Sequence, residues 1–142
     1  MADRPLLLAE RQILLVEDNF DARELVTFIL ESAGATVISA ESIAAGLSVL
    51  EQLKPDLILT DLKLPDGDGC SYLSTWRQRE TELGIACIPA IAMSGADRNV
   101  SEKRALDAGF QHYISKPFSI KTLVEVAVEV ISKHQQAGCL VG

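Results

Sequence analysis

The sequence predicts an α/β fold: a doubly wound, five-stranded parallel sheet with helices on both faces. Five short apolar segments alternate with five segments whose apolar residues recur at helical spacing. A chain that alternates strand and helix favours right-handed crossovers and therefore a parallel sheet. The chain has 142 residues, 48% of them hydrophobic, which is enough to bury the core of one such domain.

The first half of the chain contains two pairs of strand and helix. Residues 13–16 (ILLV) are the first expected strand, and Asn19 is a suitable N-cap for a helix that ends at Gly34. Residues 36–38 are the second strand, and Ser42 caps the helix that follows it. The core-facing side of the first helix is expected to contain Ala22, Leu25, Val26, Ile29, Leu30 and Ala33.

The centre of the chain supplies the third strand, residues 57–59 (LIL), which is apolar throughout and therefore expected to be fully buried. The sequence LPDG at residues 64–67 predicts a turn after this strand. A helix from about Gly69 to Glu82 and a strand at residues 88–93 complete this part of the fold.

The last two helices differ strongly in apolar content. The helix expected at residues 97–108 has too few apolar residues for a strong core stripe, so we expect it to be the least firmly anchored. Residues 112–114 form the fifth strand, and Ser119 caps the final helix, whose stripe is widened by Val126 and Val130. The core-facing residues of this helix are expected to be Ile120, Leu123, Val124, Ala127, Val128 and Ile131.

Composition excludes several classes of protein. A net charge of −7 argues against a nucleic-acid-binding surface, and no segment approaches the roughly 20 apolar residues that a membrane span needs. The three cysteines show no C-x-x-C spacing, so we expect neither a disulfide framework nor a zinc site, which fits a reducing cytoplasm. Residues 12–133 are expected to form the domain, with an N-terminal extension at 1–11 and a C-terminal tail at 134–142.

Polar side chains follow four of the five strands. They are Glu17 and Asp18 after the first strand, Asp61 after the third, Ser94 after the fourth and Lys116 after the fifth. Because ligands bind where parallel strands end, we expect these groups to converge at one edge of the sheet. Three carboxylates close together need a cation, and hard oxygen ligands suit Mg²⁺. A hydroxyl and an ammonium beside them suit phosphoryl oxygens, so this edge fits phosphoryl transfer onto a carboxylate, with Asp61 as the most central candidate nucleophile.

The motifs at these strand ends are LLVEDN, LILTDLKLPDGDG, IAMSG and YISKPF. Each alone is weak, and each charged residue alone reads more simply as a surface or turn residue. Together, in this order, they resemble the receiver domain of two-component response regulators over roughly residues 12–133. The resemblance implies a flavodoxin-like (βα)5 fold with strand order 2-1-3-4-5.

The resemblance also implies a role for each metal-binding residue. Asp18 and Asp61 would bind Mg²⁺ directly, Glu17 would bind it through water, and the backbone carbonyl of Lys63 would complete the protein ligands. Lys63 stands two residues after Asp61, where a side chain lies near the path of the water that hydrolyses the acyl phosphate.

The phosphoryl-binding residues follow from the same resemblance. Asp61 would accept the phosphoryl group from a phosphohistidine, Ser94 and Lys116 would contact its oxygens, and the Lys116-Pro117 peptide would be cis. Ser94 and Tyr113 would form the switch: the hydroxyl turns toward the phosphoryl group, and Tyr113 rotates inward to fill the space.

The implied function is signalling through protein contacts rather than turnover of a free substrate. The expected donor is a histidine kinase or a histidine phosphotransfer protein. The expected output is a homodimer or a downstream protein bound at the fourth helix, fifth strand and fifth helix, with no direct contact to nucleic acid or membrane. A phosphatase of the haloacid dehalogenase type would need a second aspartate where Lys63 stands. A flavodoxin-like nucleotide binder would need a phosphate loop after the first strand, and a phosphate-independent pseudo-receiver remains the alternative.

Overall fold

Strands and helices alternate along the chain in the computed structural model, which describes residues 6–95 and 98–137. The elements are β1 (Gln12–Val16), α1 (Phe20–Ser32), β2 (Thr36–Ala40), α2 (Ile43–Gln52), β3 (Leu57–Asp61), β4 (Lys63–Leu64), β5 (Gly67–Asp68), α3 (Gly69–Leu83), β6 (Ala90–Ser94), α4 (Arg98–Ala108), β7 (His112–Ser115) and α5 (Ile120–Ala137).

The main sheet has five parallel strands in the order β2-β1-β3-β6-β7. Counted among the long strands alone, this is the predicted order 2-1-3-4-5, so the fold class is confirmed. The hairpin of β4 and β5 was not predicted; it occupies the segment after the third strand for which the sequence predicts a turn.

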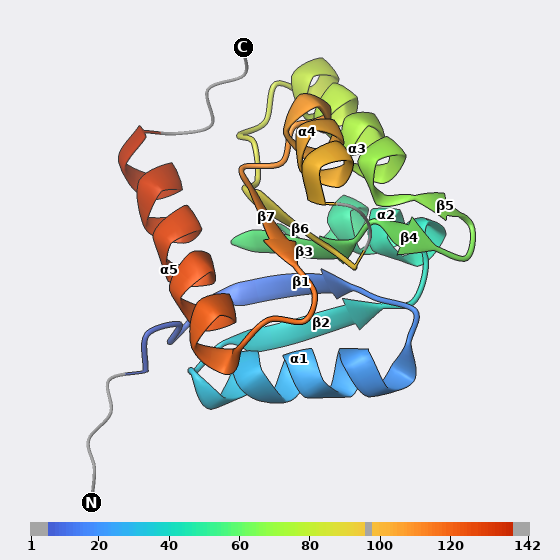
Figure 1. The fold of residues 1–142 in the computed structure, drawn as a ribbon. Helices are drawn as coiled ribbons and strands as arrows, with labels where there is room; N and C mark the ends of the chain where they lie inside the picture. The colour runs from blue at the N-terminus through green and yellow to red at the C-terminus, as the bar shows by residue number, and fades with distance from the viewer. Residues whose placement is uncertain (1–5, 96–97, 138–142) are drawn as a thin grey trace, which may run out of the picture.

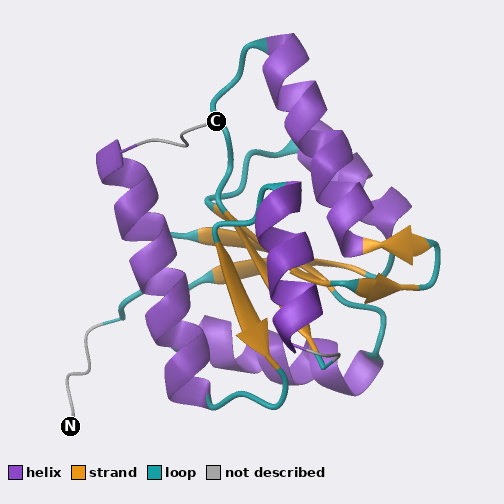
Figure 2. Ribbon diagram, turned by 45° about the horizontal axis from the view of Figure 1, so that its top comes forward, coloured by secondary structure: helices purple, strands orange, loops and turns teal. Residues whose placement is uncertain are grey.

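Helices cover both faces of the sheet (Figures 1 and 2): α1 and α5 lie on one face, and α2, α3 and α4 lie on the other. Alternate residues of each strand face opposite layers, as pleating requires. In β1, Leu15 packs in the core under α1 and α5, and Leu14 packs in the core under α2 and α3. The central strand β3 is buried at every position, which explains its continuous apolar sequence.

The N-caps predicted for three helices are confirmed where their atoms are described. Asn19 Oδ1 accepts a hydrogen bond from the Ala22 amide at 2.8 Å, and Ser42 Oγ accepts one from the Ala45 amide at 3.2 Å. Ser119 Oγ accepts one from the Thr122 amide at 3.0 Å. These side chains satisfy amides that have no partner within the helix.

Helix faces differ from the prediction at the edges of the apolar stripes. Leu25 and Ile120, expected in the core, are exposed by 55% and 61%. Val130 is buried and Val126 is half-buried against the same core as α1. The widened stripe of α5 therefore serves core packing at Val130 and, in part, at Val126.

The weak anchoring expected for α4 agrees with its packing. Among its residues with described side chains, Ala105 and Ser101 are buried, whereas Val100 and Leu106 are exposed. The helix therefore rests on the sheet through small side chains, which gives it little apolar area to lose if it shifts.

Residues near the two ends of the domain also pack on it. The Leu8 side chain is buried, and its amide donates to the Ala33 carbonyl at 2.8 Å. Helix α5 continues to Ala137, past the predicted domain limit at residue 133. That limit stays a prediction, and residues 1–5 and 138–142 of the predicted extension and tail lie outside the described residues, as do Ala96 and Asp97.

Two further expectations concern cysteines and membranes. Cys70 is a buried free thiol, but Cys87 is disulfide-bonded, so the expectation of no disulfide was wrong. Neither stretch of described chain, 6–95 or 98–137, contains a helix that is long and apolar enough to cross a membrane.

A buried acid in α3 was not predicted. The Glu80 carboxylate, 3% exposed, accepts hydrogen bonds from Trp76 Nε1 at 2.9 Å and from the Ile88 amide at 2.8 Å. It also forms an ion pair of 2.8 Å with Arg77, whose guanidinium reaches the Gly109 carbonyl at the end of α4. The network joins α3, the approach to β6 and the end of α4.

Candidate phosphoryl-transfer site

The predicted polar residues meet at the carboxyl edge of the sheet. Asp61 and Ser94 are the last residues of the neighbouring strands β3 and β6, whereas Glu17 and Asp18 follow β1 and Lys116 follows β7. Parallel strands bring these ends together from segments up to 99 residues apart in sequence.

Lys116 joins two of the carboxylates. Its Nζ lies 2.8 Å from Asp61 Oδ2 and 3.0 Å from Glu17 Oε1. Burial favours the neutral amine, but hydrogen bonds to Asp61 and Glu17 outweigh this effect and raise the pKa of Lys116. The Lys116-Pro117 peptide is cis, as the resemblance implied.

Glu17 is held inside the protein, with 1% of its surface exposed. Burial raises the pKa of Glu17, and this effect outweighs the hydrogen bonds from the Asn19 amide at 3.1 Å and from Lys116. The carboxylate therefore gains from any further cation in the site.

The three carboxylates fit a divalent cation. Glu17, Asp18 and Asp61 each offer one oxygen, and these oxygens all lie within 4.8 Å of one another. Asp18 is exposed, which leaves room for water on an ion bound there. An all-oxygen site that is open on one side suits Mg²⁺, which usually keeps several waters. The Lys63 amide donates to Asp61 Oδ1 at 3.1 Å, so the chain turns around the Asp61 carboxylate.

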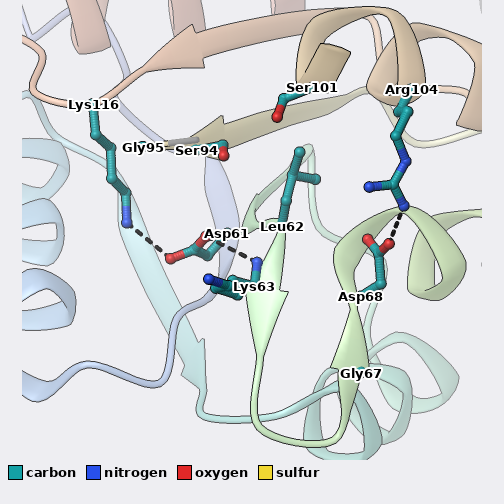
Figure 3. A pocket seen from close by; sticks show the side chains of 10 residues that line it. All are labelled: Asp61, Leu62, Lys63, Gly67, Asp68, Ser94, Gly95, Ser101, Arg104 and Lys116. Atoms are coloured by element: carbon teal, nitrogen blue, oxygen red, sulfur yellow. Dashed lines mark hydrogen bonds and ion pairs between the residues drawn. The ribbon is translucent and has the colours of Figure 1, made fainter. Parts of the chain in front are cut away.

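Two clefts meet at Asp61. One, of about 430 Å³, is lined by the acidic residues Glu17 and Asp18. The other, of about 580 Å³ (Figure 3), lies on the side of Ser94. Asp61, Lys63 and Lys116 line both, so the Asp61 carboxylate is open to a metal ion from one side and to an anionic group from the other.

The switch pair that the resemblance implies, Ser94 and Tyr113, is buried, and its role stays a prediction. Ser94 is 6% exposed and lines the larger cleft. Tyr113 is 2% exposed and packs in the core that contains Ala105 and Phe110. The Tyr113 side chain therefore lies inside the protein in this structure.

Three polar residues of the larger cleft, Asp68, Ser101 and Arg104, were not predicted as site residues. Ser101 and Arg104 line it from α4, and Arg104 forms an ion pair with Asp68, the N-cap of α3 (Figure 3). A spacing of three residues places Ser101 and Arg104 on one helix face. That spacing was the available signal, but it points to no particular neighbour.

Comparisons with known proteins identify the family. The model of the response regulator receiver domain matches residues 13–128. The KDP operon transcriptional regulatory protein KdpE of Escherichia coli is 39% identical over 111 residues, which are 78% of this chain and 47% of KdpE. This chain therefore spans about half the length of that regulator.

A relative of similar length is an uncharacterized 14.6 kDa protein of Leptolyngbya boryana, 36% identical over 119 residues, which are 84% of this chain and 88% of that protein. Among solved structures, a CheY-like receiver domain protein of Methanospirillum hungatei is 28% identical, with a TM-score of 0.78 over 90% of this chain and 98% of the other. The chain therefore belongs to the response regulator receiver domain family of two-component systems.

Proposed function

We propose that this receiver accepts a phosphoryl group on Asp61 from a phosphohistidine of a histidine kinase or a histidine phosphotransfer protein. The observation that carries the proposal is the position of Asp61, with Lys116 at 2.8 Å and the acidic pair Glu17 and Asp18 beside it. The receiver acts as a signalling phospho-acceptor. Its only chemistry is the transfer of a phosphoryl group onto its own Asp61 and the later hydrolysis of that group.

In the transfer step, an Asp61 carboxylate oxygen attacks the phosphorus of the donor phosphohistidine. An O–P bond forms and the N–P bond breaks, and the imidazole nitrogen leaves with the electron pair. Lys116 and Ser94 line the cleft where the transferred oxygens would lie, so an ammonium and a hydroxyl can bind the charge that these oxygens carry.

Asp18 and Asp61 would hold Mg²⁺ directly, Glu17 through a water and Lys63 by its backbone carbonyl. The ion supplies positive charge that screens the Asp61 carboxylate from the incoming phosphoryl oxygens. The fold places Asp18 and Asp61 close together and keeps Glu17 buried. The Lys116 ammonium pairs with Glu17 and Asp61 and so balances part of the negative charge of these two carboxylates.

The output surface that we propose is α4, β7 and α5, which would bind a downstream protein or a second copy. Val100 and Leu106 of α4 and Ile120 of α5 are exposed apolar side chains of these elements. The Ser94 hydroxyl would couple the site to this surface. In Ser94→Ala, beryllofluoride should no longer change partner binding or self-association, and an equal response in both proteins would show that the hydroxyl does not carry the signal.

The proposed setting is the cytoplasm, without direct binding to nucleic acid or membrane.

The test of the function is incubation with a panel of phosphorylated histidine kinases and phosphotransfer proteins, with and without Mg²⁺. Fast transfer from one donor, lost in excess chelator, is expected. Absence of transfer from every donor and from acetyl phosphate would favour the alternative, a pseudo-receiver that acts by protein contacts alone.

A further inference from the structure

Arg23 lies in the first turns of α1, and its guanidinium turns back toward the acidic loop after β1. Its Nη1 donates to the Glu17 carbonyl at 2.9 Å and to the Asp18 carbonyl at 3.3 Å. Its Nη2 lies 3.3 Å from Glu41 Oε1, in the turn before α2. The Arg23 side chain is only 12% exposed, and its contact with the Glu17 carbonyl is partly buried, whereas its contacts with the Asp18 carbonyl and with Glu41 lie nearer the solvent.

The two carbonyls belong to the peptide units on either side of the Asp18 Cα. Holding both units fixes the backbone angles of Asp18 and hence the direction in which its carboxylate leaves the chain. The Asp18 side chain itself is exposed, so packing contributes little to its direction. The amides of this loop are held by other groups: the Glu17 amide donates to the Ala40 carbonyl at 3.0 Å, and the Asn19 amide donates to Glu17 Oε2 at 3.1 Å. Arg23 adds the contacts to the two carbonyls on either side of Asp18.

We infer that Arg23 is a positioning residue for the metal site: its planar guanidinium holds the loop of Glu17 and Asp18 so that Asp18 faces Asp61. This inference rests on the proposed Mg²⁺-dependent acceptor function. A lysine would keep the charge, but its ammonium is a rotatable point charge on a flexible stem and does not fix the two carbonyls in the plane that the guanidinium imposes.

If Arg23 acted only through its charge, its removal would change the Mg²⁺ affinity in the opposite direction. A cation near three carboxylates repels Mg²⁺, so removal of the Arg23 charge alone would tighten Mg²⁺ binding. Groups that orient metal ligands typically change metal affinity by about 10- to 100-fold when they are replaced. The sign of the change therefore separates positioning from charge.

The experiment measures Mg²⁺ binding directly, without a phosphodonor, by calorimetry and by amide chemical shifts. The variants are Arg23→Lys, which keeps the charge, and Arg23→Gln, which removes it. Glu41→Gln is the matched control, because it removes the ion pair of Arg23 and leaves both carbonyl contacts in place; Glu41 is 74% exposed. Thermal unfolding in chelator reports whether each variant is folded.

Both Arg23 variants are expected to bind Mg²⁺ about 10-fold more weakly, and Glu41→Gln to stay within two-fold of wild type. The Mg²⁺ concentration for half-maximal labelling by acetyl phosphate should rise by the same factor as the dissociation constant. Wild-type affinity in folded Arg23→Lys, or tighter binding in Arg23→Gln, would overturn the inference. Loss of folding in both Arg23 variants would also overturn it, because Arg23 would then be a structural residue.

The result also separates this inference from the function on which it rests. If the wild type binds Mg²⁺ but no donor labels it, the proposed function fails and the positioning role of Arg23 stands or falls by the affinities alone. If the wild type is labelled and the variants bind Mg²⁺ as it does, only the inference fails. If the wild type binds no Mg²⁺, both are wrong.

Discussion

Replacement of Lys116 by methionine should destabilise the protein in a way that Mg²⁺ reverses. The ammonium is shared by Asp61 and Glu17 at 2.8 and 3.0 Å. Without it, the site contains three carboxylates whose oxygens lie within 4.8 Å of one another and no cation among them. Methionine keeps the length and apolar stem of the lysine, so the change acts mainly on charge.

The magnitude follows from the burial of the pair. Removal of one partner of a buried ion pair costs about 3 to 5 kcal/mol. Because the Lys116 side chain is 29% exposed and water can screen the remaining charges, we expect the lower end, about 3 kcal/mol. An ion that binds only the folded state at 100 times its dissociation constant stabilises by about 2.7 kcal/mol, so Mg²⁺ should restore most of this loss.

The assay is urea unfolding of wild type and Lys116→Met in chelator and in saturating Mg²⁺. The stabilisation by Mg²⁺ should be larger in the variant, because the ion no longer competes with the ammonium for the same carboxylates. Lys63→Met is the matched control, since it removes one positive charge from an exposed side chain of the same clefts. A loss below about 1 kcal/mol in chelator, or equal gains from Mg²⁺ in both proteins, would refute the charge balance.

Three further predictions test other parts of the structure. Glu80→Ala should lower the free energy of unfolding in urea by about 3 to 5 kcal/mol, because it leaves buried donors and a cation unpaired; a loss below about 1 kcal/mol would contradict the network. Lys63→Asn should change the autodephosphorylation rate several-fold, whereas an unchanged rate would mean that the side chain points away from the phosphoryl group. Burial raises the pKa of the Cys70 thiol to about 11. Alkylation of Cys70 in the native protein, followed by mass mapping, should therefore be slow at pH 8 and accelerate toward pH 11. Alkylation at pH 8 as fast as that of an unfolded thiol would contradict the raised pKa.

The sheet and the convergence of the site residues were predictable because both depend on the sequence in which strands and helices follow one another along the chain. Once the strands alternate with helices, the right-handed crossover places every strand end at one edge, and Asp61 follows as the central carboxylate. The rule and the strand order place Lys116 at the same edge but two strands from Asp61, and the contact of 2.8 Å also needs the reach of the long lysine side chain.

The supporting contacts were not predictable, since they depend on which way long side chains turn. In the sequence, Arg23 is a charged residue on an amphipathic helix and reads as solvated, yet its guanidinium folds back onto the loop before the helix. Glu80 likewise is one of many polar residues of α3, yet it is buried among Trp76, Arg77 and the chain that leads into β6. The β4 and β5 strands have two residues each, too few for any periodicity.

Mass-spectrometric mapping of the phosphoryl group in wild type and Asp61→Asn tests the acceptor assignment most directly. Acetyl phosphate with Mg²⁺ should place an acid-labile, hydroxylamine-sensitive phosphoryl group on the peptide that contains Asp61, and Asp61→Asn should gain none. Beryllofluoride should perturb the amides around Asp61 and Ser94 in the wild type and leave those of the variant unchanged. Equal labelling of Asp61→Asn, or a phosphoryl group on another peptide of the wild type, would contradict the assignment.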